Sequence, residues 1–166
     1  MNLDLQMSPK LTYPIQSLEG LRNDPARRFL GDVGLPADNL LFGFAEPLAR
    51  QVEADGGERK FIRVGEGGDD EEFCVDIDTG EVVCVNLADA SIWHVSDSPE
   101  KFLACLEEFM SRYPYGEGES ELEEREAMAN ALKEALIAID ATVFDEDPGY
   151  WYTILGDVAI GDYSDE

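Results

Sequence analysis

The tripeptide Asp78-Thr79-Gly80 has the most direct catalytic precedent in this sequence. Aspartic proteases carry their active aspartate in such a tripeptide, and two carboxylates there share one proton within an all-β frame. Ile154-Leu155-Gly156 offers a second glycine motif of the kind that such an enzyme also needs. However, Glu81 stands where the active-site loop needs a small residue, one tripeptide per chain would require a homodimer, and two helical segments separate the motifs. We therefore interpret Asp78-Thr79-Gly80 as the corner of a β-hairpin.

Segments rich in carboxylates and thiols raise the question of metal binding. The segments DIDTGE and DEDPGY begin like a calcium loop, but glycine occupies the fifth position, which needs an oxygen ligand, and the sixth is not glycine. Cys74, Cys84, His94 and Cys105 follow one another at intervals of about ten residues, whereas zinc sites draw ligands in close pairs. The spacing leaves open that Cys74 and Cys84 meet across a hairpin, or that His94 pairs with a thiol. The sequence predicts no catalytic, cofactor-binding or metal-binding residue, and therefore no enzyme.

The distribution of charge restricts the class of partner. The formal net charge is -25, and residues 1–63 contribute only -1 of it, so the last 103 residues carry -24. Nucleic acid and anionic membranes are poor partners, because no basic stripe is present to bind them. A basic protein fits better, although a charge of this kind also serves solubility alone.

Other features of the composition suggest a cytoplasmic protein. No apolar run reaches the roughly 18 residues that a membrane span needs, and the opening MNLDLQMSPK lacks the basic start and apolar centre of a signal peptide. The three cysteines include no CxxC pair, which is typical of reduced thiols.

The pattern of apolar residues predicts an α+β fold in one domain over residues 1–166, with a central, mostly antiparallel sheet and helices packed around it. Residues 1–23 are a lead-in with one short strand. The predicted strands are 11–15, 40–44, 59–65, the two arms of the hairpin, and 91–95. The predicted helices cover 24–33, 98–113, 120–139 and a short segment from about 148 that ends at Gly161.

The hairpin arms EEFCVDI and EVVCVNL alternate between polar and apolar residues. A three-residue loop with Gly80 left-handed would place Val75 opposite Val83 and Cys74 opposite Cys84. The sequence then predicts one buried face, made of Phe73, Val75, Val83 and Val85.

Four segments together resemble a known family. They are RRFLGDVGLP, FCVDIDTGEVVCVN, SIWHVSDSPEKFLACLEEF and AIDATVFDEDPGYWYTILGDVAIG. In this order they are similar to the SUKH superfamily, specifically its fourth immunity-protein subgroup, over residues 24–161. The loop before the hairpin is unusually acidic, and YGEGESELEE is longer than the pattern suggests.

The resemblance implies a bacterial immunity protein that neutralises a cognate polymorphic toxin, a nuclease or a nucleic-acid deaminase, by stoichiometric binding. It implies no catalytic residues. A regulatory scaffold of the same fold with a non-toxin partner is the alternative, and the oligomeric state stays open. A toxin that acts on nucleic acid presents a basic cleft, which an acidic partner would occupy in a salt-sensitive way.

The predicted contact residues are acidic side chains in segments expected to be exposed, together with one aromatic residue. They are Asp69, Asp70, Glu71, Glu72, Asp145, Glu146, Asp147 and Trp93. A solvated surface for the carboxylates and a core position for Trp93 are the alternative interpretations.

Overall fold

The computed structural model describes residues 8–54, 56–118 and 120–164, and the remaining residues of the lead-in and of the predicted domain lie outside this description. A two-stranded sheet pairs β1 (Lys10–Leu11) with β2 (Leu35–Pro36). The main sheet contains β3 (Gly43–Ala54), β4 (Gly57–Glu66), β5 (Glu71–Asp76), β6 (Val82–Asn86) and β7 (Ile92–Ser96). The helices are η1 (Ile15–Leu18), α2 (Asp24–Asp32), α3 (Pro99–Ser111), α4 (Leu122–Ile139) and α5 (Tyr150–Ile160).

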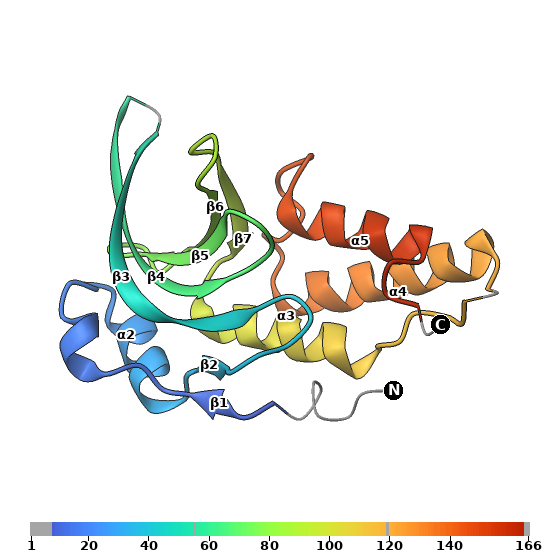
Figure 1. Ribbon diagram of the computed structural model, residues 1–166, viewed down its shortest axis with the longest axis horizontal. Coiled ribbons are helices and arrows are strands. Elements are labelled where there is room, and N and C mark those ends of the chain that lie inside the picture. Colours follow the sequence, from blue (N-terminus) through green and yellow to red (C-terminus); the bar gives the residue numbers. More distant parts are fainter. Residues whose placement is uncertain (1–7, 55, 119, 165–166) are drawn as a thin grey trace.

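The main sheet is an antiparallel meander in the order β3-β4-β5-β6-β7, and it curls strongly (Figure 1). Register shifts between Phe44 and Leu48 and between Arg63 and Gly65 mark bulges, which increase local twist. Gly65 is required there, because a Cβ atom would lie 2.1 Å from the ring of Phe42. The predicted α+β fold with a central antiparallel sheet is confirmed.

Helices cover one face of this sheet. Figure 1 shows α2 and α3 beneath the sheet and α4 and α5 beside the β7 edge. The main core lies between these layers, and Phe73, Phe102, Leu136 and Trp151 are completely buried in it. The Trp151 indole also donates to the carbonyl of Val95 at 3.1 Å, which attaches α5 to β7.

Local capping explains where the helices begin and end. The Ser98 hydroxyl accepts a hydrogen bond from the Lys101 amide at 3.2 Å, and Pro99 opens α3. Gly161, at φ 95°, ends α5 in the left-handed conformation. Asn23, and not Asp24, caps α2, because its side chain accepts the Ala26 amide at 3.0 Å. The four predicted α-helices are confirmed, with boundaries shifted by one or two residues.

The predicted strand at 40–44 was largely wrong. The chain instead becomes extended at Gly43 and continues to Ala54, and β3 forms a long hairpin with β4. Pro47 and the polar segment that follows it hid this strand, since its residues are mostly half-exposed or exposed. In the lead-in, the predicted 11–15 strand is shortened to β1, and a 3-10 turn follows it.

The predicted register of the β5–β6 hairpin was wrong by one residue. Phe73 pairs with Cys84, Cys74 with Val83 and Val75 with Val82. The loop is longer because the Asp76 amide donates to the Glu81 carbonyl, which leaves Ile77 outside the ladder. The backbone of Ile77 instead bonds to other segments, with its carbonyl accepting the amides of Arg22 and Asn23.

The hairpin is buried on both faces. Phe73, Val75, Val82 and Cys84 face the main core. A smaller outer cluster lies on the opposite face and consists of Phe61, Cys74, Val83 and Val85, with Val52 and Ile92 packed against it. Val83 and Val85 therefore do not share a face with Phe73 and Val75, contrary to the prediction.

Candidate functional site

The corner at Asp78-Thr79-Gly80 has a complete structural role. The Asp76 carboxylate accepts the amides of Asp78 and Thr79 at 2.9 and 3.0 Å, and Gly80 has φ 79°. The Asp78 carboxylate is exposed and accepts a hydrogen bond from Arg22 at 2.6 Å. Ile154-Leu155-Gly156 lies within α5, so it forms no glycine loop opposite Asp78. The interpretation as a hairpin corner is confirmed.

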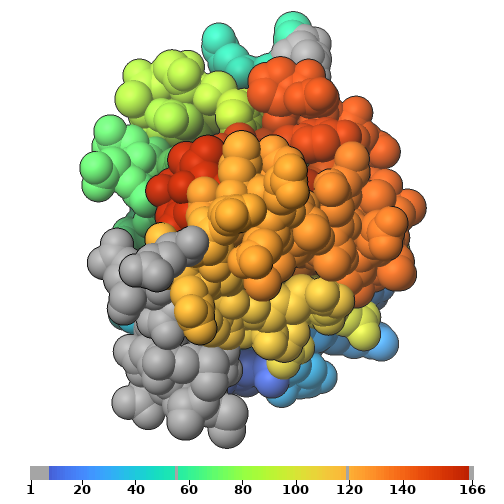
Figure 2. Space-filling view, turned by 90° about the vertical axis from the view of Figure 1, so that its right-hand side faces the viewer, coloured from blue at the N-terminus to red at the C-terminus, as the bar shows by residue number. Residues whose placement is uncertain are grey.

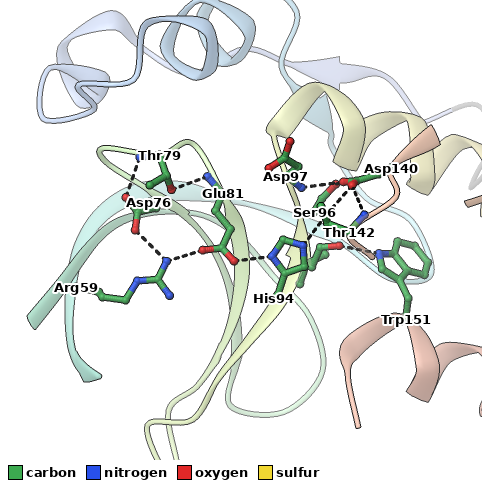
Figure 3. Close-up of polar contacts among 11 residues, drawn as sticks. Arg59, Asp76, Thr79, Glu81, His94, Ser96, Asp97, Asp140, Thr142 and Trp151 are labelled. Atoms are coloured by element: carbon green, nitrogen blue, oxygen red, sulfur yellow. Dashed lines mark hydrogen bonds and ion pairs between the residues drawn. The ribbon is translucent and has the colours of Figure 1, made fainter. Parts of the chain in front are cut away.

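A chain of paired polar groups, here called the outer network, runs from this corner to the loop between α4 and α5 (Figure 3). It consists of Arg59, Asp76, Glu81, His94, Ser96, Asp140 and Thr142. Arg59 bridges Asp76 at 2.9 Å and Glu81 at 2.5 Å. The His94 ring contacts Glu81 through Nδ1 and the Thr142 hydroxyl through Nε2, the latter at 2.8 Å. The network therefore connects the outer face of the sheet to the α4–α5 loop.

Asp140 anchors the far end of the outer network. It is 1% exposed and accepts hydrogen bonds from the Ser96 hydroxyl at 2.6 Å, the Asp97 amide at 2.8 Å, and the amide and hydroxyl of Thr142. Burial alone would raise the pKa of Asp140, but these donors outweigh it and lower the pKa. The carboxylate therefore stays ionised in a structural position.

His94 and Glu81 form a mutually stabilising pair. The hydrogen bond to Glu81 raises the pKa of His94 although burial opposes the shift. Burial would raise the pKa of Glu81, but His94 and Arg59 overcome it and lower the pKa. Each group thus stabilises the charged form of the other, which argues against His94 as a free base.

The thiols are buried and unreactive in this environment. Cys74, Cys84 and Cys105 are free cysteines, and burial raises the pKa of Cys74 and of Cys105 to about 12. The open possibility that Cys74 and Cys84 meet across the hairpin is excluded, because they point to opposite faces of the sheet. No group of three or more metal-ligating side chains occurs within the described ranges.

A pocket of about 370 Å³ opens on the helix-facing side of the sheet, between the β6–β7 end and α5. We call it the acidic pocket. Its lining consists of Leu40, Leu41, Gly68, Glu71, Cys84, Asn86, Asp89, Ser91, Trp93, Tyr150, Thr153, Ile154, Asp157 and Tyr163. In Figure 2 the segment before β5 (green), the β6–β7 turn (yellow-green) and the end of the chain (red) come together on one face. Segments distant in sequence thus build one concave site.

The acidic pocket contains negative charge without a counter-charge. Glu71, Asp89 and Asp157 line it, its lining includes no lysine, arginine or histidine, and none of the three forms an ion pair with a described residue. Burial, and then the charge of Asp162, raises the pKa of Asp157. Burial, followed by the charges of Asp157 and Asp162, raises the pKa of Tyr163 to about 12. The site is therefore an uncompensated negative environment.

A comparison with known protein families matches residues 11–157 to the SUKH-4 immunity protein family. The chain belongs to the SUKH-4 immunity protein family. The match confirms the predicted resemblance, and it includes every residue that lines the acidic pocket except Tyr163. Comparisons with curated proteins and with solved structures gave no significant match.

The fold brings together some of the predicted contact residues of this SUKH-4 protein. Glu71 and Trp93 both line the acidic pocket, and Asp69 and Asp70 are exposed in the adjoining loop. Glu72 was wrongly expected to be exposed. It is 4% exposed and accepts hydrogen bonds from Arg50 at 2.6 and 2.9 Å and from Arg63 at 3.2 Å.

The remaining predicted carboxylates form a second group. Asp145, Glu146 and Asp147 are exposed in the α4–α5 loop. Glu146 borders a shallow hollow that also includes Arg59, Glu81 and His94, on the outer-network side. These three carboxylates are therefore not part of the acidic pocket.

The predicted contact residues did not include four further charged or aromatic residues of the pocket lining: Asp89, Tyr150, Asp157 and Tyr163. A signal was present for two of them. Tyr150, Thr153, Ile154 and Asp157 follow the i, i+3, i+4, i+7 spacing that places residues on one helix face. A carboxylate, a threonine and a tyrosine on one helix face indicate that this face borders a site as well as the core.

No helix in the described parts of the chain has both the length and the apolar character needed to cross a membrane.

Proposed function

We propose that this protein is a bacterial immunity protein that neutralises a cognate polymorphic toxin by one-to-one binding, without catalysis. Membership of the SUKH-4 immunity protein family supports a role in immunity. The observation that carries the binding mode is the acidic pocket, where three carboxylates without counter-ions surround a concave site. We further propose that the protein acts in the cytoplasm, where a toxin directed at nucleic acid would find its substrate.

The proposed toxin is a nuclease or a nucleic-acid deaminase with a basic substrate cleft. Enzymes of this kind concentrate positive potential where they bind phosphates. A chain with net charge -25, of which residues 64–166 carry -24, is attracted to such a cleft and can exclude the substrate from it. This mode of binding requires no basic surface on the immunity protein, and it involves neither nucleic acid nor a membrane as a partner of that protein.

The proposed contact surface centres on the acidic pocket and includes Asp69, Asp70, Glu71 and Trp93. Asp145, Glu146 and Asp147 form a second proposed contact on the outer-network side. Glu72 is excluded from both, because its carboxylate is already neutralised by Arg50 and Arg63. Unpaired charges on a surface are free to steer a partner, whereas paired ones are not.

Co-expression with toxins encoded by neighbouring genes tests the proposal. We expect rescue of growth and recovery of a one-to-one complex, with an association rate that falls steeply as salt increases. Failure to rescue growth, combined with capture of a non-toxin regulator, would instead support the scaffold alternative. An association rate that does not change with salt concentration would contradict binding driven by electrostatic attraction.

A further inference from the structure

The hydroxyl of Tyr150 is a polar group inside the acidic pocket that the chain itself does not satisfy. Tyr150 is 7% exposed, and its hydroxyl has no hydrogen-bond partner among the residues that the structure describes. The groups that act on it electrostatically include Cys84, Tyr163, Glu71 and Asp157, which all line the pocket. The hydroxyl therefore lies on the pocket side of the ring.

Every buried side-chain nitrogen and oxygen atom among the described residues has a hydrogen-bond partner, so the unpartnered hydroxyl of Tyr150 is open to the pocket and is not sealed in the core. The other side of the ring already packs edge-on against Phe73 and Trp151, at centroid distances of 5.4 and 5.3 Å. The ring thus packs in the core, while the hydroxyl oxygen forms no hydrogen bond with any residue that the structure describes. A hydroxyl that faces the pocket without a protein partner can donate to or accept from a ligand in the pocket.

The residues that line the acidic pocket favour a positively charged ligand. Glu71, Asp89 and Asp157 supply acceptors from β5, the β6–β7 turn and α5, and Trp93 and Tyr163 supply aromatic surface. Carboxylates beside aromatic rings are the combination that binds guanidinium and ammonium groups in proteins. A volume of about 370 Å³ is at the small end for ligand sites, which suits one inserted side chain rather than a large molecule.

We propose that the acidic pocket receives an arginine side chain presented by the protein partner. A guanidinium has five donors in a planar fork and no acceptor, so it can bond to Glu71, Asp157 and the Tyr150 hydroxyl while its face lies on an aromatic ring. A lysine offers three donors at a single point and would satisfy fewer of these groups. Buried arginine anchors are common among residues that dominate protein interfaces. The identity of the partner rests on the proposed function, but the preference of the pocket does not.

The preference can be tested on the purified chain with a defined probe. The probe is N-acetyl-Gly-Arg-Gly-amide, and the matched controls carry lysine or citrulline, the uncharged isostere of arginine. The indole N–H signal of Trp93 reports on the pocket, and that of the buried Trp151 serves as an internal reference. At physiological salt we expect a saturable shift of Trp93 with arginine, a weaker one with lysine and none with citrulline.

Substitutions separate the pocket from general acidity. We expect Glu71→Gln combined with Asp157→Asn to weaken arginine binding roughly tenfold or more, and Tyr150→Phe to weaken it by about fivefold. Glu126→Gln combined with Glu134→Gln removes the same charge from exposed positions on α4, and Tyr152→Phe removes a hydroxyl outside the pocket. These controls should bind the probe as the unmodified chain does. Equal binding by the pocket variants, or an equal response to citrulline, would overturn the proposal.

Growth rescue with the cognate toxin distinguishes the two proposals. If the chain binds arginine as described but fails to protect against any neighbouring toxin, the immunity function is wrong and the pocket assignment stands. If the chain protects and the pocket variants protect equally well, with unchanged affinity in the complex, the pocket does not recognise the toxin and the inference fails. Loss of protection in the pocket variants, with protection retained in the Glu126→Gln, Glu134→Gln control, supports both.

Discussion

The outer network and the acidic pocket use the same residue types for opposite purposes. They lie on opposite faces of the sheet, because successive residues of a strand alternate. In β5, Glu72 and the network residue Asp76 lie on the outer face with arginines of β3 and β4, whereas Glu71 faces the pocket. Every carboxylate in the outer network has a donor. Those in the pocket have no cationic partner among the described residues.

The difference shows how to distinguish paired from unpaired carboxylates in an acidic protein. Net charge does not separate them, and neither does sequence position, since Glu71 and Glu72 are neighbours. The donors that each carboxylate finds within the chain separate them: Asp76 and Glu81 contact Arg59 or His94, and Asp140 accepts several hydrogen bonds from uncharged groups. In the outer network the pKa values of Glu81, Asp76 and Asp140 are lowered by their partners against the effect of burial. In the pocket the pKa of Asp157 is raised, whereas hydrogen bonds from Ser91 lower the pKa of Asp89. Four predictions test this contrast, in decreasing order of expected effect.

Asp140→Ala should have the largest effect. It leaves the Ser96 hydroxyl, the Asp97 amide and Thr142 without their acceptor, so we expect a loss of about 3 kcal/mol in the free energy of unfolding. Urea denaturation measures the loss. Asp145→Ala, at an exposed site in the following loop, is the matched control and should change stability by less than about 0.5 kcal/mol. Equal stability of the two variants would show that the network does not anchor this loop.

His94→Ala should destabilise the chain by an amount that depends on pH. Because the folded pKa of His94 is raised by Glu81, its stabilising contribution is complete below the unfolded pKa and is lost as the pH rises through the folded value. We expect about 2 kcal/mol of destabilisation at pH 6, from the loss of a charged hydrogen bond, and clearly less at pH 9. Unfolding measured at both pH values checks this. The control is Thr142→Val, which keeps the contact between His94 and Glu81 and should lose less stability, by an amount that hardly depends on pH. If the destabilisation caused by His94→Ala were the same at both pH values, the ion pair between His94 and Glu81 would be disproved.

Asp69→Asn combined with Asp70→Asn should slow association with the toxin by a few fold at low salt, which corresponds to less than about 1 kcal/mol. Both residues are exposed, and asparagine tolerates the left-handed conformation of Asp70, at φ 59°. Stopped-flow kinetics should show this difference disappearing at high salt, with the dissociation rate unchanged. Glu72→Gln provides the contrast, because it should lower stability and leave the association rate unaltered.

Asp157→Asn should slightly stabilise the free chain at pH 7, by at most about a few tenths of a kcal/mol, because solvent screens the charge of this partly exposed group. The folded pKa of Asp157 is raised by burial and by Asp162, so its ionised form is favoured less in the folded than in the unfolded chain. The gain should appear as a higher melting temperature at pH 7 and vanish below the unfolded pKa, where the carboxyl group is protonated in both states. Glu134→Gln, on an exposed helix face, should show no such gain. A destabilised Asp157→Asn variant would mean that Asp157 has an internal partner after all.

The sequence by itself determined the features that depend on neighbouring residues. Ser98 and Pro99 start a helix, Gly161 ends one, and Gly80 turns the hairpin, because caps and left-handed glycines act within a few residues. The order of four such local patterns also predicted the SUKH-4 family. Only the tertiary structure decided the hairpin register, since the backbone of Ile77 is engaged by Arg22, Asn23 and Lys60, which are far away in the chain.

The same distinction applies to function. The acidity of the loop before β5 is visible in the sequence, but whether each carboxylate is neutralised depends on strands that pair with it later. Arg50 and Arg63 form ion pairs with the buried Glu72, whereas Glu71 has no arginine or lysine partner among the residues that the structure describes. The acidic pocket is assembled from the segment between β2 and β3, the β5–β7 meander and α5, so its composition is a consequence of long-range packing that no local pattern encodes.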